Sequence, residues 1–252
     1  RANGNCGLCI VEFHSDHGIR DVKACQTPIA AGMTIVTKNA RLKDYRKLRL
    51  EQLLSDLGPL PIERAASTHP TVVRAVVRQV QAAGGDVVIG DSPALTLSEG
   101  RLRDVYAATG MDRVAEETGA RLNFDVRAEQ VAFPAGRLMK SLDIAGFALD
   151  ADVMISVAKW KTHELMGFTG AIKNTFGLVP GLTKPVDHAK LPDVDHFAGM
   201  LLDVLAFARP AFTLLDGVVA MHGNGPSAGD PFPAGMILAG EDPVAVDLVA
   251  SH

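Results

Sequence analysis

From residue 58 onward, short and nearly continuous apolar segments alternate with amphipathic ones, and this pattern constrains the fold more than any other feature. Apolar segments of this length are typical of strands buried on both sides, whereas longer segments with a 3.6-residue period are typical of helices. We expect strands within residues 86–91, 121–126, 150–160, 212–220 and 235–240. Strands that alternate with helices predict an α/β domain with a mostly parallel sheet, covered by helices on both faces.

Local signals mark the ends of several predicted helices. Thr68 is a suitable N-cap for a helix with Pro70 in its first turn, and the Gly84-Gly85 pair is suited to end that helix. Asp242 followed by Pro243 has the same character at the start of a helix over residues 242–250. Further helices are expected within residues 104–110, 112–119 and 196–208.

Polar side chains collect after the predicted strands, where α/β sheets bind their ligands. Asp91 follows one strand, and Lys159, Lys161 and His163 follow another. The segment 167–188 adds Lys173, Asn174, Lys184 and His188 on a stretch with too many glycines and prolines for one plain helix or strand. We predict that these eight residues form a ligand-binding crevice, with Lys161 and His163 as candidate catalytic residues.

Three interpretations of this set stay open at the level of the residues. Lysines and histidines on loops are suited to bind phosphate, a nucleotide or a carboxylate substrate. His163, His188 and His196 with Asp195 would also suit a metal site. The third interpretation is that they are solvated charges and local caps. The sequence has no serine-hydrolase elbow, no H-E-x-x-H motif and no dinucleotide fingerprint, and the glycine-rich segment 221–231 follows no phosphate-loop spacing.

The first 57 residues differ in composition from the rest. They carry nine Lys and Arg against six Asp and Glu, whereas the remainder has a net charge of −7. All three cysteines, Cys6, Cys9 and Cys25, also lie there, as C-x2-C and a third cysteine after fifteen intervening residues. This spacing favours a metal site over a disulfide framework. We therefore expect two domains, residues 1–57 and 58–252.

A four-thiolate site requires one more cysteine than the sequence contains. Either the fourth ligand precedes residue 1, or the site is a zinc site completed by His14 or His17. Three unrelated structural cysteines are the remaining alternative. The sequence does not begin with Met and ends inside an apolar helical pattern, so we expect that both ends, including the C-terminus, are truncated.

The segments NCGLCIVEF, KACQTPIAAGMTIVT and RLKDYRKLRLEQLLSD, which cover residues 4–55, resemble a known iron–sulfur domain. It is the [2Fe–2S] ferredoxin-type domain that opens the large iron–sulfur subunit of complex I, iron-only hydrogenases and formate dehydrogenases. The resemblance implies a partial β-grasp, ferredoxin-like module, with Cys6, Cys9 and Cys25 as three of four cluster ligands. The fourth would lie about ten residues upstream of the C-x2-C pair. It also weakens the zinc alternative, since His14 and His17 fall in a variable hairpin turn of that family.

The segments THPTVVRAVVRQVQAAGGDVVIGDSPA, DADVMISVAKWKTHELMGFTGAIKNTFGLVPG, DGVVAMHGNGPSAGDP and AGEDPVAVD resemble the domain of unknown function 362. This bacterial and archaeal family is often found with [4Fe–4S] ferredoxin segments, whose cysteines are absent here. The resemblance implies an α/β fold in a redox setting and names no substrate.

We therefore predict an iron–sulfur electron-transfer protein whose α/β module has an anion-binding crevice, with oxidoreductase as the candidate enzyme class. A redox partner protein or a small anionic substrate is the expected partner. The alternative is a non-redox α/β enzyme that binds an anion, nucleotide or metal, with an incidental ferredoxin fragment. The basic excess is too local for nucleic-acid binding, no apolar segment is long enough to span a membrane, and a cytoplasmic location is expected.

Overall fold

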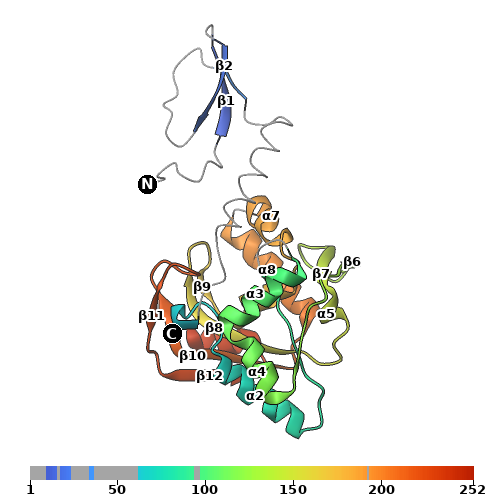
Figure 1. Cartoon of the computed structure of the whole chain (residues 1–252). Coiled ribbons are helices and arrows are strands. Elements are labelled where there is room, and N and C mark those ends of the chain that lie inside the picture. Colours follow the sequence, from blue (N-terminus) through green and yellow to red (C-terminus); the bar gives the residue numbers. More distant parts are fainter. Residues whose placement is uncertain (1–9, 16–17, 24–33, 37–61, 94–96, 192) are drawn as a thin grey trace. The chain divides into compact units, whose positions relative to one another are not determined.

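The computed structural model describes residues 10–15, 18–23, 34–36, 62–93, 97–191 and 193–252. The chain divides into two compact units, Arg1–Gly58 and Pro59–His252 (Figure 1). Each unit is described by itself. Cys6, Cys9, Cys25 and His17 lie outside the described residues.

The described part of the first unit is a three-stranded antiparallel sheet of order β2-β1-β3. Its strands are β1 (Ile10–Ser15), β2 (Gly18–Lys23) and β3 (Thr34–Val36). β1 and β2 form a hairpin in which Ser15 pairs with Gly18, and His14 pairs with Ile19 inside the ladder. His14 thus lies in strand β1.

In the second unit the helices lie between short strands, as the sequence pattern predicts. The helices are η1 (Ile62–Arg64), α2 (Pro70–Ala82), α3 (Glu99–Thr109), α4 (Met111–Thr118), α5 (Gly146–Leu149), α6 (Ala171–Asn174), η2 (Thr175–Leu178), α7 (Thr183–Lys190), α8 (Val194–Ala208) and α9 (Pro243–Ala250). The strands are β4 (Val88–Ile89), β5 (Arg121–Leu122), β6 (Ala128–Ala132), β7 (Ser141–Ala145), β8 (Ile155–His163), β9 (Gly167–Thr169), β10 (Phe212–His222), β11 (Asp230–Phe232) and β12 (Met236–Gly240).

The sheet of this unit is mixed, which corrects the prediction of a mostly parallel one. β8 and β10 are parallel, but β9, β11 and β12 all pair antiparallel with their neighbours. β4 and β5 form a separate parallel pair, and β6 and β7 a separate antiparallel pair. The connection from β10 to β12 contains β11, which also pairs antiparallel with β10, and no helix.

Helices α6 and α9 pack on one face of the central strands. Ala158 of β8 and Leu215 of β10 are fully buried against Ala171 and Val246 of these two helices. On the alternate positions of the strands, Lys161 Nζ donates to the Ala66 carbonyl and the Asp216 carboxylate accepts from the His69 amide, so the irregular segment 65–69 lies on this side. Thr68 Oγ1 of the same segment donates to the Val157 carbonyl of β8 at 2.8 Å. The expectation of helical cover on both faces is therefore not met at this position.

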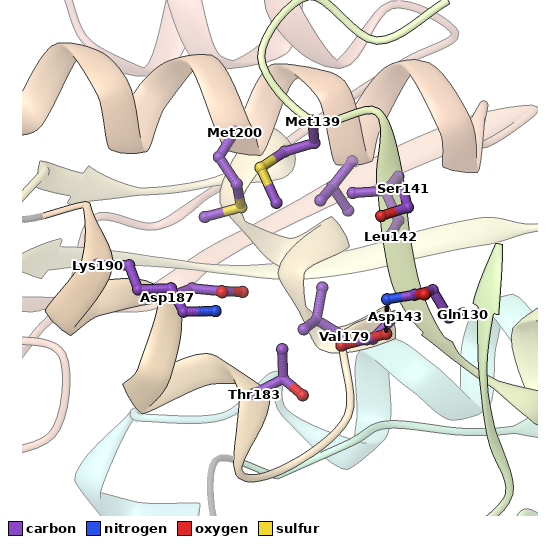
Figure 2. A pocket seen from close by; sticks show the side chains of 11 residues that line it. Gln130, Met139, Ser141, Leu142, Asp143, Val179, Thr183, Asp187, Lys190 and Met200 are labelled. Atoms are coloured by element: carbon purple, nitrogen blue, oxygen red, sulfur yellow. Dashed lines mark hydrogen bonds between the residues drawn. The ribbon is translucent and has the colours of Figure 1, made fainter. Parts of the chain in front are cut away.

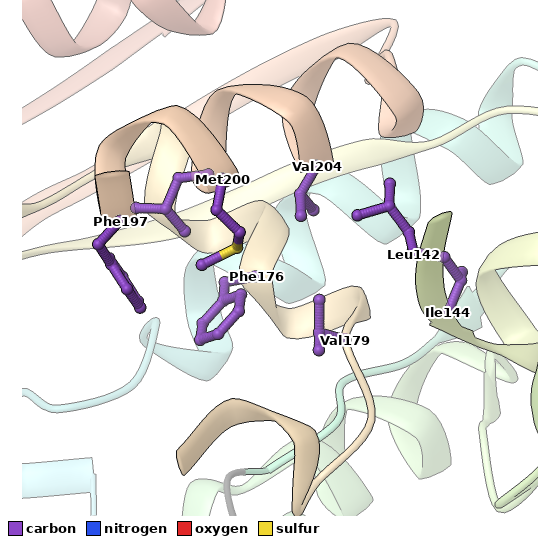
Figure 3. Packing of buried hydrophobic residues seen from close by; sticks show 8 residues of the cluster. Leu142, Ile144, Phe176, Val179, Phe197, Met200 and Val204 are labelled. Atoms are coloured by element: carbon purple, nitrogen blue, oxygen red, sulfur yellow. The ribbon is translucent and has the colours of Figure 1, made fainter. Parts of the chain in front are cut away.

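The largest hydrophobic cluster lies between α8, η2 and β7. Figure 3 shows Met200 and Phe197 of α8 packed over Phe176 of η2, with Leu142 of β7 at the other end of the cluster. All four side chains are at least 96% buried. Burial of this kind contributes about 1.5–3 kcal/mol for each large apolar side chain. The cluster holds η2, and with it the segment that follows α6, in place.

Two helix N-termini test the predicted caps. Asp242 caps α9 as expected, because its carboxylate accepts from the amides of Val244 and Ala245, and Pro243 occupies the first turn. The N-cap of α2, however, is His69 rather than Thr68. The His69 ring accepts from the Thr71 amide at 3.2 Å, whereas the Thr68 hydroxyl is committed to β8. Tertiary contact has displaced the cap by one residue.

Candidate functional site

The two central strands hold a buried ion pair at the base of the candidate site. Lys159 of β8 and Asp216 of β10 are register partners, and their Nζ and Oδ2 atoms are 2.9 Å apart. The side chain of Lys159 is 5% exposed and that of Asp216 is 0% exposed. Asp216 also accepts from the amides of His69 and Val218 at 2.9 and 3.1 Å. Lys159 is thus structural, and the sequence prediction that it binds ligand has no support in these contacts.

Beyond this pair, β8 carries Lys161 and His163 to its carboxyl end. Lys161 Nζ donates to the Ala66 carbonyl at 2.6 Å. The Nδ1 atom of His163 accepts from the amides of Leu165 and Met166, both at 3.2 Å. These two donors fix the neutral tautomer in which Nε2 carries the proton. His163 is therefore positioned by the tight turn that follows the strand.

Helix α6 brings Lys173 and Asn174 to the same end of the sheet. Its first amides, those of Ala171 and Ile172, donate to the carboxylate of Asp247 in α9 at 2.6 and 2.9 Å. Gly170 makes this approach possible, since a Cβ atom there would lie 2.1 Å from Asp247 Oδ1. The α9 carboxylate therefore occupies the N-terminus of α6 and fixes where the helix starts.

The two side chains of α6 have different surroundings. The Asn174 amide donates to the Ser156 hydroxyl at 2.9 Å, which ties α6 to β8. Lys173 makes no side-chain hydrogen bond or ion pair with the described residues, and its ammonium lies 5.7 Å from the centre of the Phe176 ring. Asn174 therefore has a structural contact, while Lys173 is available to a ligand.

Helix α7 adds Lys184 and His188, one turn apart on the same side. The Lys184 ammonium donates to the Ser92 carbonyl, and the His188 Nδ1 atom lies 2.8 Å from the Lys184 carbonyl. The His188 ring stacks on that of His163 with centroids 6.2 Å apart and packs on Phe197 at 4.3 Å. The sequence predicts a loop for these two residues, and the structure corrects this to a helix.

Asp91 and Ser92 complete this group from the end of β4. The Ser92 amide donates to the Gly177 carbonyl at 3.1 Å, and its fully buried hydroxyl accepts from the Gly181 amide at 3.0 Å. Gly177 also leaves room for Asp91, whose Oδ1 atom would lie 2.8 Å from a Cβ at that position. Asp91 itself is exposed. Sequence reasoning found Asp91 but missed Ser92 and Phe176, whose only signal is their position beside Asp91 and Asn174.

The electrostatics show that these groups affect one another. We call Lys161, Lys173, Lys184, His163 and His188 the basic cluster. Burial lowers the pKa of each of its three lysines from 10.5 to about 8. The ammonium groups of Lys161 and Lys184 lower the pKa of Lys173 further, while Asp91 opposes the fall at Lys161 and Lys184. Burial and then the nearby Lys173 lower the pKa of His163 to about 4, and burial also lowers that of His188.

The arrangement is chemically suited to hold an anion. Like charges held close together raise the free energy of the unliganded protein, and a bound anion removes that cost. A lysine amine with a pKa near 8 is also partly unprotonated at neutral pH, which is the form that accepts a proton or attacks a carbonyl carbon. The six residues that the structure brings together are therefore the five of the basic cluster and Asp91.

The metal alternative finds no support in the part of the chain that is described. Among those residues no group of three or more His, Cys, Asp and Glu side chains is arranged to hold a metal ion. His196 is exposed on α8, where its ring contacts Asp193 at 3.0 Å, and Asp195 is exposed beside it. The His163 and His188 rings stack on each other, but His196 is engaged elsewhere.

Comparison with known proteins agrees with both predicted resemblances. Residues 55–252 match the family described as Domain of unknown function (DUF362). The chain belongs to the DUF362 family. Residues 1–40 match a 2Fe-2S iron-sulfur cluster binding domain, so this DUF362 protein carries an iron–sulfur domain before its α/β unit. The thylakoid-associated protein sll1697 of Synechocystis sp. is 36% identical over 194 residues, which are 74% of this chain and 56% of the relative. The chain thus spans just over half the length of that relative.

The similarity to solved structures is weaker than the similarity to this relative. The lactate racemase apoprotein from Thermoanaerobacterium thermosaccharolyticum aligns with 58% of this chain and 36% of its own, at 18% identity and a TM-score of 0.36. That score carries no argument about fold or function. Within the described residues no helix has the length and apolarity needed to cross a membrane. The cytoplasmic location stays a prediction.

Proposed function

We propose that the α/β unit of this DUF362 protein binds a small anion with more than one negative charge, a phosphate or carboxylate compound, at the basic cluster. The observation that carries the proposal is the convergence of three lysines and two histidines from β8, α6 and α7. The nearby carboxylate of Asp91 raises the pKa of Lys161 and Lys184 against the effect of burial. Surface lysines normally avoid one another. Lys161 and Lys173 are half-buried and Lys184 is buried, so a cluster that keeps these three ammonium groups close together stores a repulsion that an anion relieves.

The chemistry divides between the members of the cluster. Lys161 and Lys184 are anchored to backbone carbonyls, so their ammonium groups are fixed in place and suited to bind the anion. Lys173 is held only over Phe176, and its amine is the one best able to reach a substrate. His163 carries its proton on Nε2 and can donate a hydrogen bond from that atom. Its lowered pKa keeps the ring neutral at neutral pH. Lys161 and His163 remain our candidates for catalytic roles.

Titration calorimetry with inorganic phosphate, pyrophosphate and citrate, each against sodium chloride at equal ionic strength, tests anion binding. We expect binding of at least one of the three and a loss of about 10- to 100-fold in affinity for Lys173→Ala, since a hydrogen bond to a charged group contributes about 1.5–3 kcal/mol. Lys140→Ala is the matched control, because Lys140 is exposed and donates only to carbonyls of its own loop. No binding, or equal losses in the two variants, would contradict the proposal.

We further propose that the iron–sulfur domain holds a [2Fe–2S] cluster through Cys6, Cys9, Cys25 and a fourth ligand that is not among residues 1–252. We propose that this cluster exchanges electrons with a redox partner protein. When bound, the cluster would supply one-electron transfer. The proposal rests on the family match of residues 1–40 and on the β1–β2–β3 sheet. Anaerobic reconstitution of the protein with its upstream residues restored should give charge-transfer absorption and an EPR signal on reduction. A colourless, EPR-silent product would contradict it.

The non-redox alternative has one observation in its favour. Every member of the basic cluster, and Asp91, lies in the second unit, so anion binding needs nothing from the first. If phosphate binds equally well before and after cluster reconstitution, and no electron transfer to the site is measurable, the α/β unit acts as a non-redox anion-binding module. If cluster reduction changes the affinity for the anion, the two units function together.

A further inference from the structure

A second site lies under the other side of α7, in a cavity of about 170 Å³. Its base consists of Leu142, Val179, Met200 and Val204, which are buried members of the hydrophobic cluster. A cavity of about 150 Å³ lined by such side chains is large enough to hold benzene. The apolar end of this cavity therefore fits an apolar group of about that size.

The other side of the cavity is polar and acidic. Asp187 of α7 lines it and is 7% exposed, and its carboxylate makes no hydrogen bond or ion pair with the described residues. Figure 2 shows the Asp187 carboxylate directed into the space between α7, α8 and β7. Asp143 lies across the cavity, where the Gln130 amide contacts it at 3.5 Å, and Thr183 adds a hydroxyl. A carboxylate buried without a partner is costly, so its direction into a cavity indicates a missing partner.

We propose that this cavity binds a small organic cation, a primary ammonium on an apolar group of about benzene size, with the ammonium paired to Asp187. The apolar group would occupy the space over Leu142 and Met200, and the ammonium would donate to the carboxylates of Asp187 and Asp143. An ammonium has three donors and no acceptor, which matches a wall of carboxylate and hydroxyl oxygens.

Two other occupants fit the contacts less well. A metal ion would need a third His, Cys, Asp or Glu ligand, and the described residues offer no such group. Lys190 of α7 lines the same cavity, and its charge opposes the rise that burial causes in the pKa of Asp187, but the two form no ion pair within 4.0 Å in the part of the chain that is described. Lys190 is exposed, and its ammonium competes for Asp187 with any cation that enters the cavity. The proposal rests on no part of the anion-binding function, because Lys184 and His188 lie on a different side of α7.

The test uses benzylamine as the probe and benzyl alcohol as its neutral counterpart, with the full 252-residue chain. Two of the eight methionines, Met139 and Met200, line the cavity, so their ¹³C-methyl NMR signals report binding at this place. We expect both signals to shift with benzylamine, and benzylamine to bind about tenfold more tightly than benzyl alcohol, since a charge-assisted hydrogen bond contributes about 1.5–3 kcal/mol. No shift, or equal affinities, would overturn the proposal.

Three variants locate the interaction. Asp187→Asn should abolish the preference for the amine, whereas Asp152→Asn, a change of an exposed carboxylate elsewhere, should leave it intact. Lys190→Met removes the competing cation from an exposed position and should tighten benzylamine binding, so it gives a result even if Asp187→Asn fails to fold. A preference for the amine that persists in Asp187→Asn, or that weakens in Lys190→Met, would also overturn the proposal.

Discussion

The buried pair of Lys159 and Asp216 allows a quantitative prediction about stability. Lys159→Met removes the ammonium but keeps the length of the side chain, and leaves the Asp216 carboxylate, which is 0% exposed, with only two backbone donors. Breaking a buried pair in this way costs about 3–5 kcal/mol, because an uncompensated charge remains in the interior. With a urea dependence of about 2–3 kcal/mol per molar for a unit of this size, the unfolding midpoint should fall by about 1–2 M.

The assay follows the emission of Trp160, the one tryptophan of the chain, which lies in the second unit next to Lys159 and is partly buried against β10 and α9. Far-UV circular dichroism provides a second probe, in case the substitution changes the fluorescence directly. Lys140→Met on the exposed surface is the control and should change the free energy of unfolding by no more than about 0.5 kcal/mol.

A double-mutant cycle separates the pair from its surroundings. Asp216→Asn keeps an oxygen that can accept from the His69 amide, so the combined variant removes both charges with little change in shape. We expect it to lose at least about 2 kcal/mol less than the sum of the two single variants. Additive losses, or a Lys159→Met protein with an unchanged midpoint, would refute the claim that these charges depend on each other.

Three further predictions concern the basic cluster. Asp247→Ala leaves two amides of α6 without an acceptor and should lower the free energy of unfolding in urea by about 2–4 kcal/mol. Phosphate affinity should also fall, because Lys173 is displaced. Unchanged affinity in a folded Asp247→Ala protein would count against that link. The lysines of the cluster, with pKa values near 8, lose charge as pH rises from 7 to 9, so calorimetric phosphate affinity should fall over that range. Without an anion the unfolded chain binds more protons than the folded one between pH 8 and 10.5, so the free energy of unfolding should rise with pH in that range. If phosphate affinity and the free energy of unfolding instead changed in the same direction with pH, the lowered lysine pKa values would be contradicted. Long-range ¹H–¹⁵N spectra should show His163 neutral with its proton on Nε2 down to pH 5, and an imidazolium at pH 6 would disprove its lowered pKa.

The sequence predicts local structure well where one segment decides it. The cap formed by Asp242 and Pro243 depends on neighbours within three residues, and the strand at 150–160 and the helix at 196–208 have strong apolar patterns. The β12 strand is also found, but its antiparallel direction is not, because direction depends on what the connection from β10 forms, here β11 and no helix, rather than on the strand itself.

The candidate site is predicted as a set of residues but not as an arrangement. The position of polar residues after strands brings out Asp91, Lys161 and His163. It cannot separate Lys159, whose partner Asp216 is distant in sequence, from Lys173, which has no such partner. Asp187 escapes detection because a carboxylate within a short helix resembles any solvated charge until the packing around it is known.

The contact between Asp247 and α6 also has a consequence for synthesis of the chain. Lys173 takes its position from a helix whose first two amides depend on a carboxylate 75 and 76 residues further along. A ribosome adds roughly 5–20 residues per second, so several seconds separate the emergence of α6 from that of its cap. During that interval three lysines and two histidines exist without the framework that gathers them. The proposed anion site therefore cannot be among the first parts of the protein to form, and a nascent chain halted before α9 should bind phosphate weakly even though all five basic residues have been made.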